Sequence, residues 1–81
     1  MKEKPIPLHM LSIGSFGRIT ELTAHNNSRR RMLDLGFINN TVVEALRRSP
    51  SGDPTAYQIR GVVIALRSEE ASNILVENVL V

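Results

Sequence analysis

The second half of this chain is a succession of short aliphatic and β-branched runs, and this feature most constrains its fold. The three runs are Val42–Arg48, Thr55–Arg60 and Val62–Arg67, and each favours an extended strand. Turn-forming Ser, Pro, Gly and Asp residues at positions 49–54 separate the first two runs, and Gly61 permits a tight reversal between the second and the third. Short strands joined by tight turns predict an antiparallel sheet.

The first half adds an extended arm and one further strand. Pro5 to Leu11 is predicted to form the arm and to place Leu8 and Leu11 in the core. A strand is expected over Arg18–Ala24, where the apolar residues Ile19 and Leu22 are three positions apart. Because side chains of a regular strand alternate between faces, this spacing predicts a bulge or a twist.

One helix is expected between these two halves. Residues 25–28 form a polar break that is rich in N-cap residues, so we expect a helix over Arg29 to Leu35. Gly36 is placed to end this helix in the left-handed conformation, and Phe37 is then expected to pack back on Met32.

A second short helix is expected to begin at Ser68, its predicted cap. Glu69 and Glu70 then lie in the first turn, where the helix dipole favours anions. A closing strand is expected over Val76 to Val81. About five short strands and two short helices predict a mostly β fold that is closed by curvature into a small barrel.

Composition limits the function classes. A chain of 81 residues is expected to form a single domain with a compact core, and that core is expected to be aliphatic because aromatic residues make up only 4%. The chain contains no cysteine, which excludes disulfides and thiol chemistry and fits a reducing cytosol. Charged Met1–Lys4 leads into Pro5, so no signal peptide is expected. The longest apolar run, Val62–Leu66, is far shorter than the roughly 20 residues of a membrane span, so a membrane connection is expected only through a partner.

One ordered pattern runs through these elements. Its members are Leu8, Leu11, Gly14, Gly17 and Ile19, then Arg31 to Phe37, Val43, Gly52 to Pro54, Tyr57 to Gly61, Ile64 to Arg67, Glu70, Ala71, Ile74 and Val76. This combination resembles the FeoA family, the small cytosolic partner of the ferrous iron permease FeoB, over residues 8–76. The family commonly has Pro-Gly where this chain has Asn39-Asn40, and both dipeptides form turns.

The resemblance implies an SH3-like barrel with interposed helices. It further implies a non-enzymatic cytosolic role in bacterial Fe(II) uptake, by contact with the FeoB permease and its GTP-binding domain. The same fold occurs as the C-terminal module of DtxR-type metal-dependent repressors, so a regulatory or sensor module is the alternative. No helix-turn-helix precedes the pattern in this sequence, which favours the transport accessory. The oligomeric state stays open.

No residue of this chain is assigned to catalysis or to a metal. His9 and His25 lie in different segments and show no ligand spacing. A transition-metal ion, held through space or between copies, stays open only at the level of the family. The segment Gly14–Gly17 lacks the Lys-Ser/Thr pair of a phosphate-binding loop. Ser28 and Ser68 are better explained as helix caps than as nucleophiles.

The basic helix is the candidate docking element. Arg29–Arg31 would lie in its first turn, where the dipole disfavours cations by a few tenths of a kcal/mol each. The arginines either cover the barrel with their stems or bind a partner. The candidate partner-binding residues are Arg30, Arg31, Met32, Leu35 and Phe37. A nucleic-acid interface that also uses Arg47 and Arg48 is disfavoured, because the net charge is only +2 and no aromatic residue lies within an arginine run.

Overall fold

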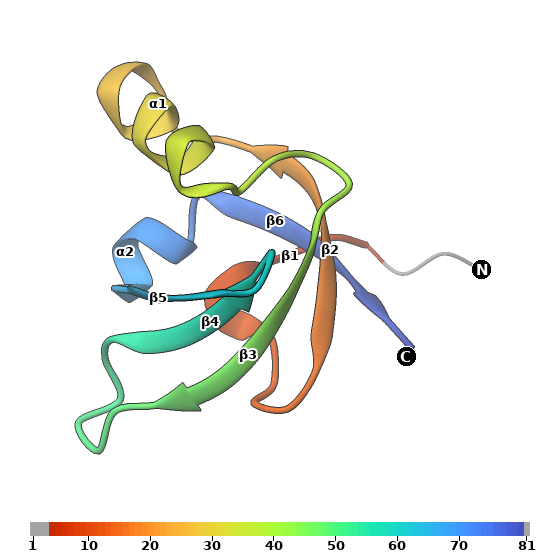
Figure 1. Ribbon diagram of the computed structural model, residues 1–81, viewed down its shortest axis with the longest axis vertical. Coiled ribbons are helices and arrows are strands. Elements are labelled where there is room, and N and C mark those ends of the chain that lie inside the picture. The colour runs from red at the N-terminus through yellow and green to blue at the C-terminus, as the bar shows by residue number, and fades with distance from the viewer. Residues whose placement is uncertain (1–3, 81) are drawn as a thin grey trace.

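The structure of the chain is a computed structural model that describes residues 4–80 (Figure 1). Within these residues, six antiparallel strands form one sheet: β1 (Ile6–Pro7), β2 (Phe16–Leu22), β3 (Val42–Arg48), β4 (Thr55–Ile59), β5 (Val62–Leu66) and β6 (Ile74–Val79). The helical elements are the 3₁₀ helix η1 (Leu8–Met10), α1 (Asn26–Leu35) and α2 (Ser68–Ala71). None of the helices in this part of the chain has the length and apolar character needed to cross a membrane.

The sheet curves into an open barrel. Its strands follow the order β1-β6-β2-β3-β4-β5, so β1 and β5 are its two edges. Figure 1 shows α1 at one end of the curved sheet and the long strands β2 and β3 running away from it. Across residues 4–80 no strand pairing joins β1 to β5, so the barrel is loose. The predicted mostly β fold is confirmed, in this open form.

The strand that was not predicted is β1. It lies within the segment predicted to be an extended arm, and it pairs antiparallel with β6. The arm was correctly predicted to place Leu8 and Leu11 in the core, since they are 0% and 1% exposed. Strand β6 begins at Ile74, two residues before the predicted start at Val76, and the predicted end at Val81 lies outside the described residues.

Two strands carry an irregularity in register. In β2 the register against β6 shifts between Ile19 and Glu21, which confirms the bulge expected from the spacing of Ile19 and Leu22. In β3 the register against β4 shifts between Ala45 and Arg47. This second irregularity was not predicted, because residues 42–48 alternate regularly in sequence.

Helix α1 starts earlier than predicted and ends where predicted. It begins at Asn26 instead of Arg29, and its N-cap His25 makes no capping hydrogen bond through its side chain. At the other end Gly36 has φ of 106°, and the Phe37 N–H donates to the Met32 carbonyl at 3.0 Å. This arrangement is the predicted left-handed cap, and it turns Phe37 back into the core beside Met32.

The N-cap of α2 is Arg67 and not the predicted Ser68. The Arg67 N–H donates to Glu70 Oε1 at 3.3 Å. Ser68 instead donates its N–H to Asp53 Oδ1 at 2.9 Å. Asp53 therefore ties the loop between β3 and β4 to the start of α2.

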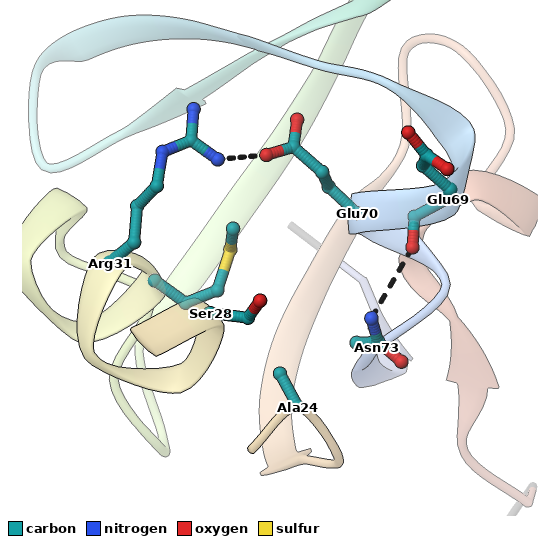
Figure 2. A pocket seen from close by; sticks show the side chains of 7 residues that line it. Ala24, Ser28, Arg31, Glu69, Glu70 and Asn73 are labelled. Atoms are coloured by element: carbon teal, nitrogen blue, oxygen red, sulfur yellow. Dashed lines mark hydrogen bonds and ion pairs between the residues drawn. The ribbon is translucent and has the colours of Figure 1, made fainter. Parts of the chain in front are cut away.

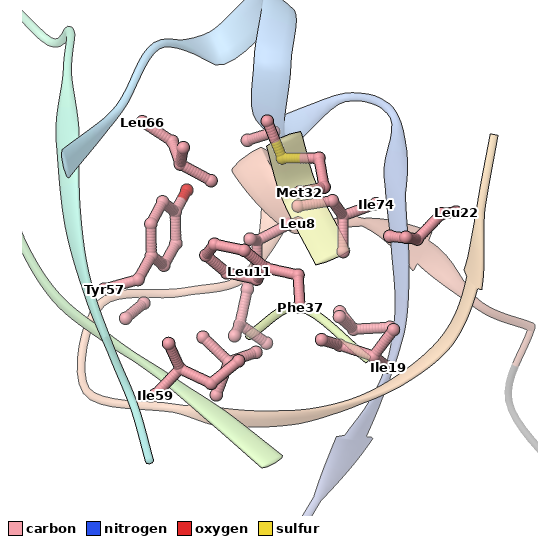
Figure 3. Close-up of a cluster of buried hydrophobic side chains, with 14 residues drawn as sticks. Leu8, Leu11, Ile19, Leu22, Met32, Phe37, Tyr57, Ile59, Leu66 and Ile74 are labelled. Atoms are coloured by element: carbon pink, nitrogen blue, oxygen red, sulfur yellow. The ribbon is translucent and has the colours of Figure 1, made fainter. Parts of the chain in front are cut away.

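One core of 14 buried side chains fills the described part of the barrel (Figure 3). Strands β2 to β6, both α-helices and η1 contribute to it, and Ile6 of β1 packs against it. Phe37 and Tyr57 are its aromatic members, and the rest is aliphatic apart from Met32. The core therefore joins segments from both halves of the chain.

Gly17 in β2 lies so close to β6 that a side chain does not fit. A Cβ at this position would lie 2.9 Å from both Cβ and Cγ2 of Val76 and 3.3 Å from Cδ2 of Leu11. We expect Gly17→Ala to lower the free energy of unfolding, measured in urea, by about 1–3 kcal/mol, because the core is overpacked. Val76→Ala removes one contacting methyl group, so the double variant should lose less than the sum of the single variants. Strict additivity would contradict the contact.

Burial raises the pKa of Tyr57 above its ordinary value of 10.0, and Thr55 and Arg48 oppose this only in part. The unfolded chain therefore loses this proton first as the pH rises. The contribution to stability is complete below pH 10.0 and is lost as the pH rises through the folded-state pKa. We expect the free energy of unfolding, measured in urea at several alkaline pH values, to fall more steeply with pH for the wild type than for Tyr57→Phe. Parallel losses in the two proteins would show that the phenol does not carry the effect.

Candidate functional site

Helix α1 has a buried face and a solvent-exposed face, and the predicted docking residues are divided between buried and exposed positions. Met32 is 3% exposed and Phe37 is 0% exposed, so neither side chain reaches a partner in the folded chain. The reason is the cap at Gly36, which folds Phe37 back beside Met32 and makes both of them core residues. Leu35 is partly buried against the same core, whereas Leu33 is 38% exposed.

The three arginines of α1 have different surroundings. Arg29 donates from Nη1 to the Leu22 carbonyl at 3.1 Å, and Arg31 forms an ion pair with Glu70 of α2. Arg30 is exposed and pairs with no carboxylate of the described residues. Because the helix begins at Asn26, all three arginines lie beyond the first three residues, where the unfavourable dipole effect is weaker than predicted.

A cleft of about 280 Å³ lies between α1 and α2 (Figure 2). Its lining residues are Ala24, Ser28, Arg31, Met32, Glu69, Glu70 and Asn73. The Arg31–Glu70 pair joins the two helices across it, and Asn73 donates from Nδ2 to the Glu69 carbonyl at 3.3 Å. The cleft is therefore lined mainly by polar and charged groups, of which Arg31 and Glu70 are paired with each other.

Sequence reasoning missed this cleft. Arg31 and Glu70 are 39 residues apart, and Glu70 was explained by its own helix dipole. Ser28, predicted as a cap, lies inside α1 and lines the cleft. Opposite charges on two short helices were the only signal, and that signal does not say which residues meet.

Arg47 and Arg48 do not extend the basic group of α1. Strand β3 starts at Val42, after the loop that follows α1, and runs away from this loop (Figure 1). Its seven residues span about 20 Å. Arg48 at its far end donates from Nε to Thr55 Oγ1 at 3.3 Å. Arg29–Arg31 and Arg47–Arg48 thus form two separate groups, whereas a nucleic-acid backbone favours one continuous basic stripe.

The two histidines lie apart from each other. His9 is half-buried in η1, and its Nδ1 has no hydrogen-bond partner among residues 4–80. His25 is exposed at the start of α1. In the part of the chain that the structure describes, no three His, Asp or Glu residues gather as a metal site would require. We therefore assign no metal ligand.

The curved sheet, the aliphatic core and the exposed helix α1 define a small β-barrel module. The model of the FeoA domain family matches residues 6–78, and the chain belongs to this family. The predicted resemblance over residues 8–76 is confirmed. The FeoA family is a family of ferrous iron transport proteins.

Solved structures support the fold. An FeoA-like protein from Clostridium acetobutylicum matches with a TM-score of 0.88 and 33% identity, over 96% of this chain and 91% of that chain. FeoA of Stenotrophomonas maltophilia, solved with zinc and described as an SH3 domain protein, matches with a TM-score of 0.78 and 25% identity, over 93% and 91%. A manganese-dependent transcriptional repressor matches with a TM-score of 0.85 over 95% of this chain and 38% of that chain, and its 18% identity shows the fold alone. The predicted SH3-like fold is confirmed.

A curated relative places this domain in a larger protein. The Fe(2+) transport protein A/Fe(2+) transporter FeoB fusion protein of Porphyromonas gingivalis is 30% identical over 70 residues. The match covers 86% of this chain and 8% of that protein. The chain thus corresponds to a small part of this relative.

The Arg31–Glu70 ion pair should contribute little to stability. Its side chains are 55% and 27% exposed, so we expect Arg31→Gln to lower the free energy of unfolding by up to about 1 kcal/mol at low salt and by less at high salt. Arg30→Gln is the matched control on the same helix and should change it by less than about 0.5 kcal/mol. Urea unfolding at two salt concentrations measures both. Equal losses in the two variants would contradict a specific α1–α2 pair.

Proposed function

We propose that this chain is a non-enzymatic cytosolic accessory protein for ferrous iron uptake, which acts by contact with the cytosolic part of an FeoB-type permease, including its GTP-binding domain. The observation that carries the proposal is the Porphyromonas gingivalis relative, whose name describes an FeoA segment fused to FeoB. A covalent link keeps two domains at a high effective concentration, so the fusion supports a working association between them.

Helix α1 is the proposed contact surface, and only its exposed side chains are proposed to touch the partner. Arg30 and Leu33 are exposed, and they join a cation to an aliphatic side chain, a combination suited to a protein interface. The exposed atoms of Arg31 and Leu35 extend this proposed surface. Met32 and Phe37 contribute to it only indirectly, because they anchor the helix on the core.

The repressor-like alternative has less support. The likeness to the manganese-dependent repressor lies at 18% identity, so it carries an argument about the fold and none about regulation. The zinc of the Stenotrophomonas maltophilia structure belongs to that protein, and the proposed contact with a permease does not depend on a bound metal.

The test is a variant that changes only exposed residues of α1. Arg30→Glu combined with Leu33→Ser should weaken binding to the purified cytosolic domains of the permease about tenfold or more and lower Fe(II) uptake by cells, because both changes act at the proposed interface. Calorimetric titration and uptake of radioactive iron measure the two effects. Met32→Ala is unsuitable, since it would cost about 2–5 kcal/mol of stability.

The matched control is Lys4→Glu combined with Met10→Ser. It makes the same kinds of change at exposed positions outside α1, where Met10 is 63% exposed. This control should bind and support uptake as the wild type does. If the α1 variant stays folded and behaves like the control, α1 is not the docking surface.

A further inference from the structure

The two edges of the sheet differ in how they are protected. Edge strand β1 has two residues, one of which is Pro7, and a short strand with proline resists pairing with another chain. Edge strand β5 has the sequence Val-Val-Ile-Ala-Leu, without charge or proline, and its register with β4 has no bulge. Val62 and Val63 are 55% and 53% exposed. By these criteria β5 is open to an additional strand.

The turn before β5 determines which backbone groups face outward. Arg60 and Gly61 have φ of 52° and 80° and close a two-residue hairpin in which Ile59 pairs with Val62. In such a hairpin the closing pair is hydrogen-bonded and the pairs alternate from there. The N–H and C=O groups of Val63 and Ala65 therefore point away from β4, toward the open edge.

The outer face of the sheet adds a charge pattern to this edge. Arg47 pairs with Ala56, which pairs with Ala65, so these three form one row across β3, β4 and β5. The two alanines are small, and they line a groove of about 330 Å³ together with Arg47, Arg48, Ser49, Pro50 and Pro54. Strands lie about 4.8 Å apart, so Ala65 lies about 9.6 Å from Arg47, and the long Arg47 side chain can extend over Ala56 toward Ala65. Among the described residues Arg47 has no carboxylate partner.

The next row of the outer face has the opposite character. Glu44 pairs with Gln58, which pairs with Val63. A residue placed beside Val63 thus meets an aliphatic neighbour, with the carboxylate of Glu44 two strands away. A residue placed beside Ala65 instead continues the row formed by Ala65, Ala56 and Arg47.

We propose that the β5 edge is a second docking site, which binds an extended acidic segment of a partner protein as an added antiparallel strand. In that segment an acidic residue pairs with Ala65 and extends its side chain back over this small residue toward Arg47, and an apolar residue two positions later pairs with Val63. The backbone groups of Val63 and Ala65 supply the hydrogen bonds, and the two rows set the register. This site is separate from α1, and it does not depend on the proposed contact with the permease.

A second copy of this chain fits the site less well than such a partner. Strand β5 contains no acidic residue, so its pairing with another β5 leaves Arg47 without a carboxylate at the edge. Two five-residue strands also bury far less than the roughly 1,200 Å² of a stable interface.

The probe is the capped hexapeptide Thr-Glu-Thr-Val-Thr-Thr, titrated to millimolar concentration into the ¹⁵N-labelled full chain. We expect saturable shifts of the Val63 and Ala65 amide signals. The peptide N-methylated at Glu and Val, the two residues that face β5, should not bind, whereas the isomer N-methylated at the first and third Thr should bind like the parent. No saturable shift, or equal binding of the two isomers, would overturn strand addition.

Charge reversal tests the register without a change in the core. Arg47→Glu should weaken binding of the Glu peptide about two- to fivefold, as expected for one exposed ion pair. The same variant should bind the Lys counterpart of the peptide better than the wild type does. If Arg47→Glu kept the preference of the wild type for the Glu peptide over the Lys peptide, the acidic residue would not lie in the row of Arg47. Shifts of Val63 and Ala65 on dilution without peptide would assign the edge to a second copy instead.

Discussion

The close approach of β2 and β6 at Gly17 and Val76 is the constraint on which the rest of the structure depends. Strand β6 lies between β1 and β2, so residues near the C-terminus hold the N-terminal segment in the sheet. Leu11, which packs beside Gly17, and Ile19 on the same strand are then brought into one core with Ile74 and Val76. Since this pairing joins the two ends of the chain, the barrel forms only when its most distant segments meet.

The same dependence explains what could be predicted from sequence. Strands β3 to β5, the bulge in β2 and the cap at Gly36 follow from local chemistry: alternation, spacing and the need for a positive φ. Strand β1 was not predicted, because a two-residue strand has no periodicity and exists only through its pairing with β6. Local patterns describe how a segment is shaped, whereas strand order is set by contacts between distant segments.

The candidate site was harder to predict than the fold for the same reason. A run such as Arg29 to Phe37 shows which residue types are near each other, but not which of them face the core. Met32 and Phe37 looked equally suited to docking and to packing until the cap placed both inside. Conversely, Leu33 is exposed although its type favours burial, and Glu70 meets Arg31 across 39 residues of sequence. Only the packed structure shows which of these side chains are exposed and which hold the helix on the core.

An SH3-like sheet that does not close must have two edges, and these two are protected unequally. At β1, Pro7 and a length of two residues prevent further pairing, while β5 keeps five uncharged residues and outward-facing backbone groups. An unprotected edge strand favours aggregation. Arg47, in the row that leads to this edge, makes pairing selective, because it favours acidic segments and disfavours basic ones. Another copy of the chain is disfavoured as well, since β5 contains no acidic residue. The open edge and the neighbouring charge are therefore best understood together, as one surface that admits an additional strand only when its charge is matched.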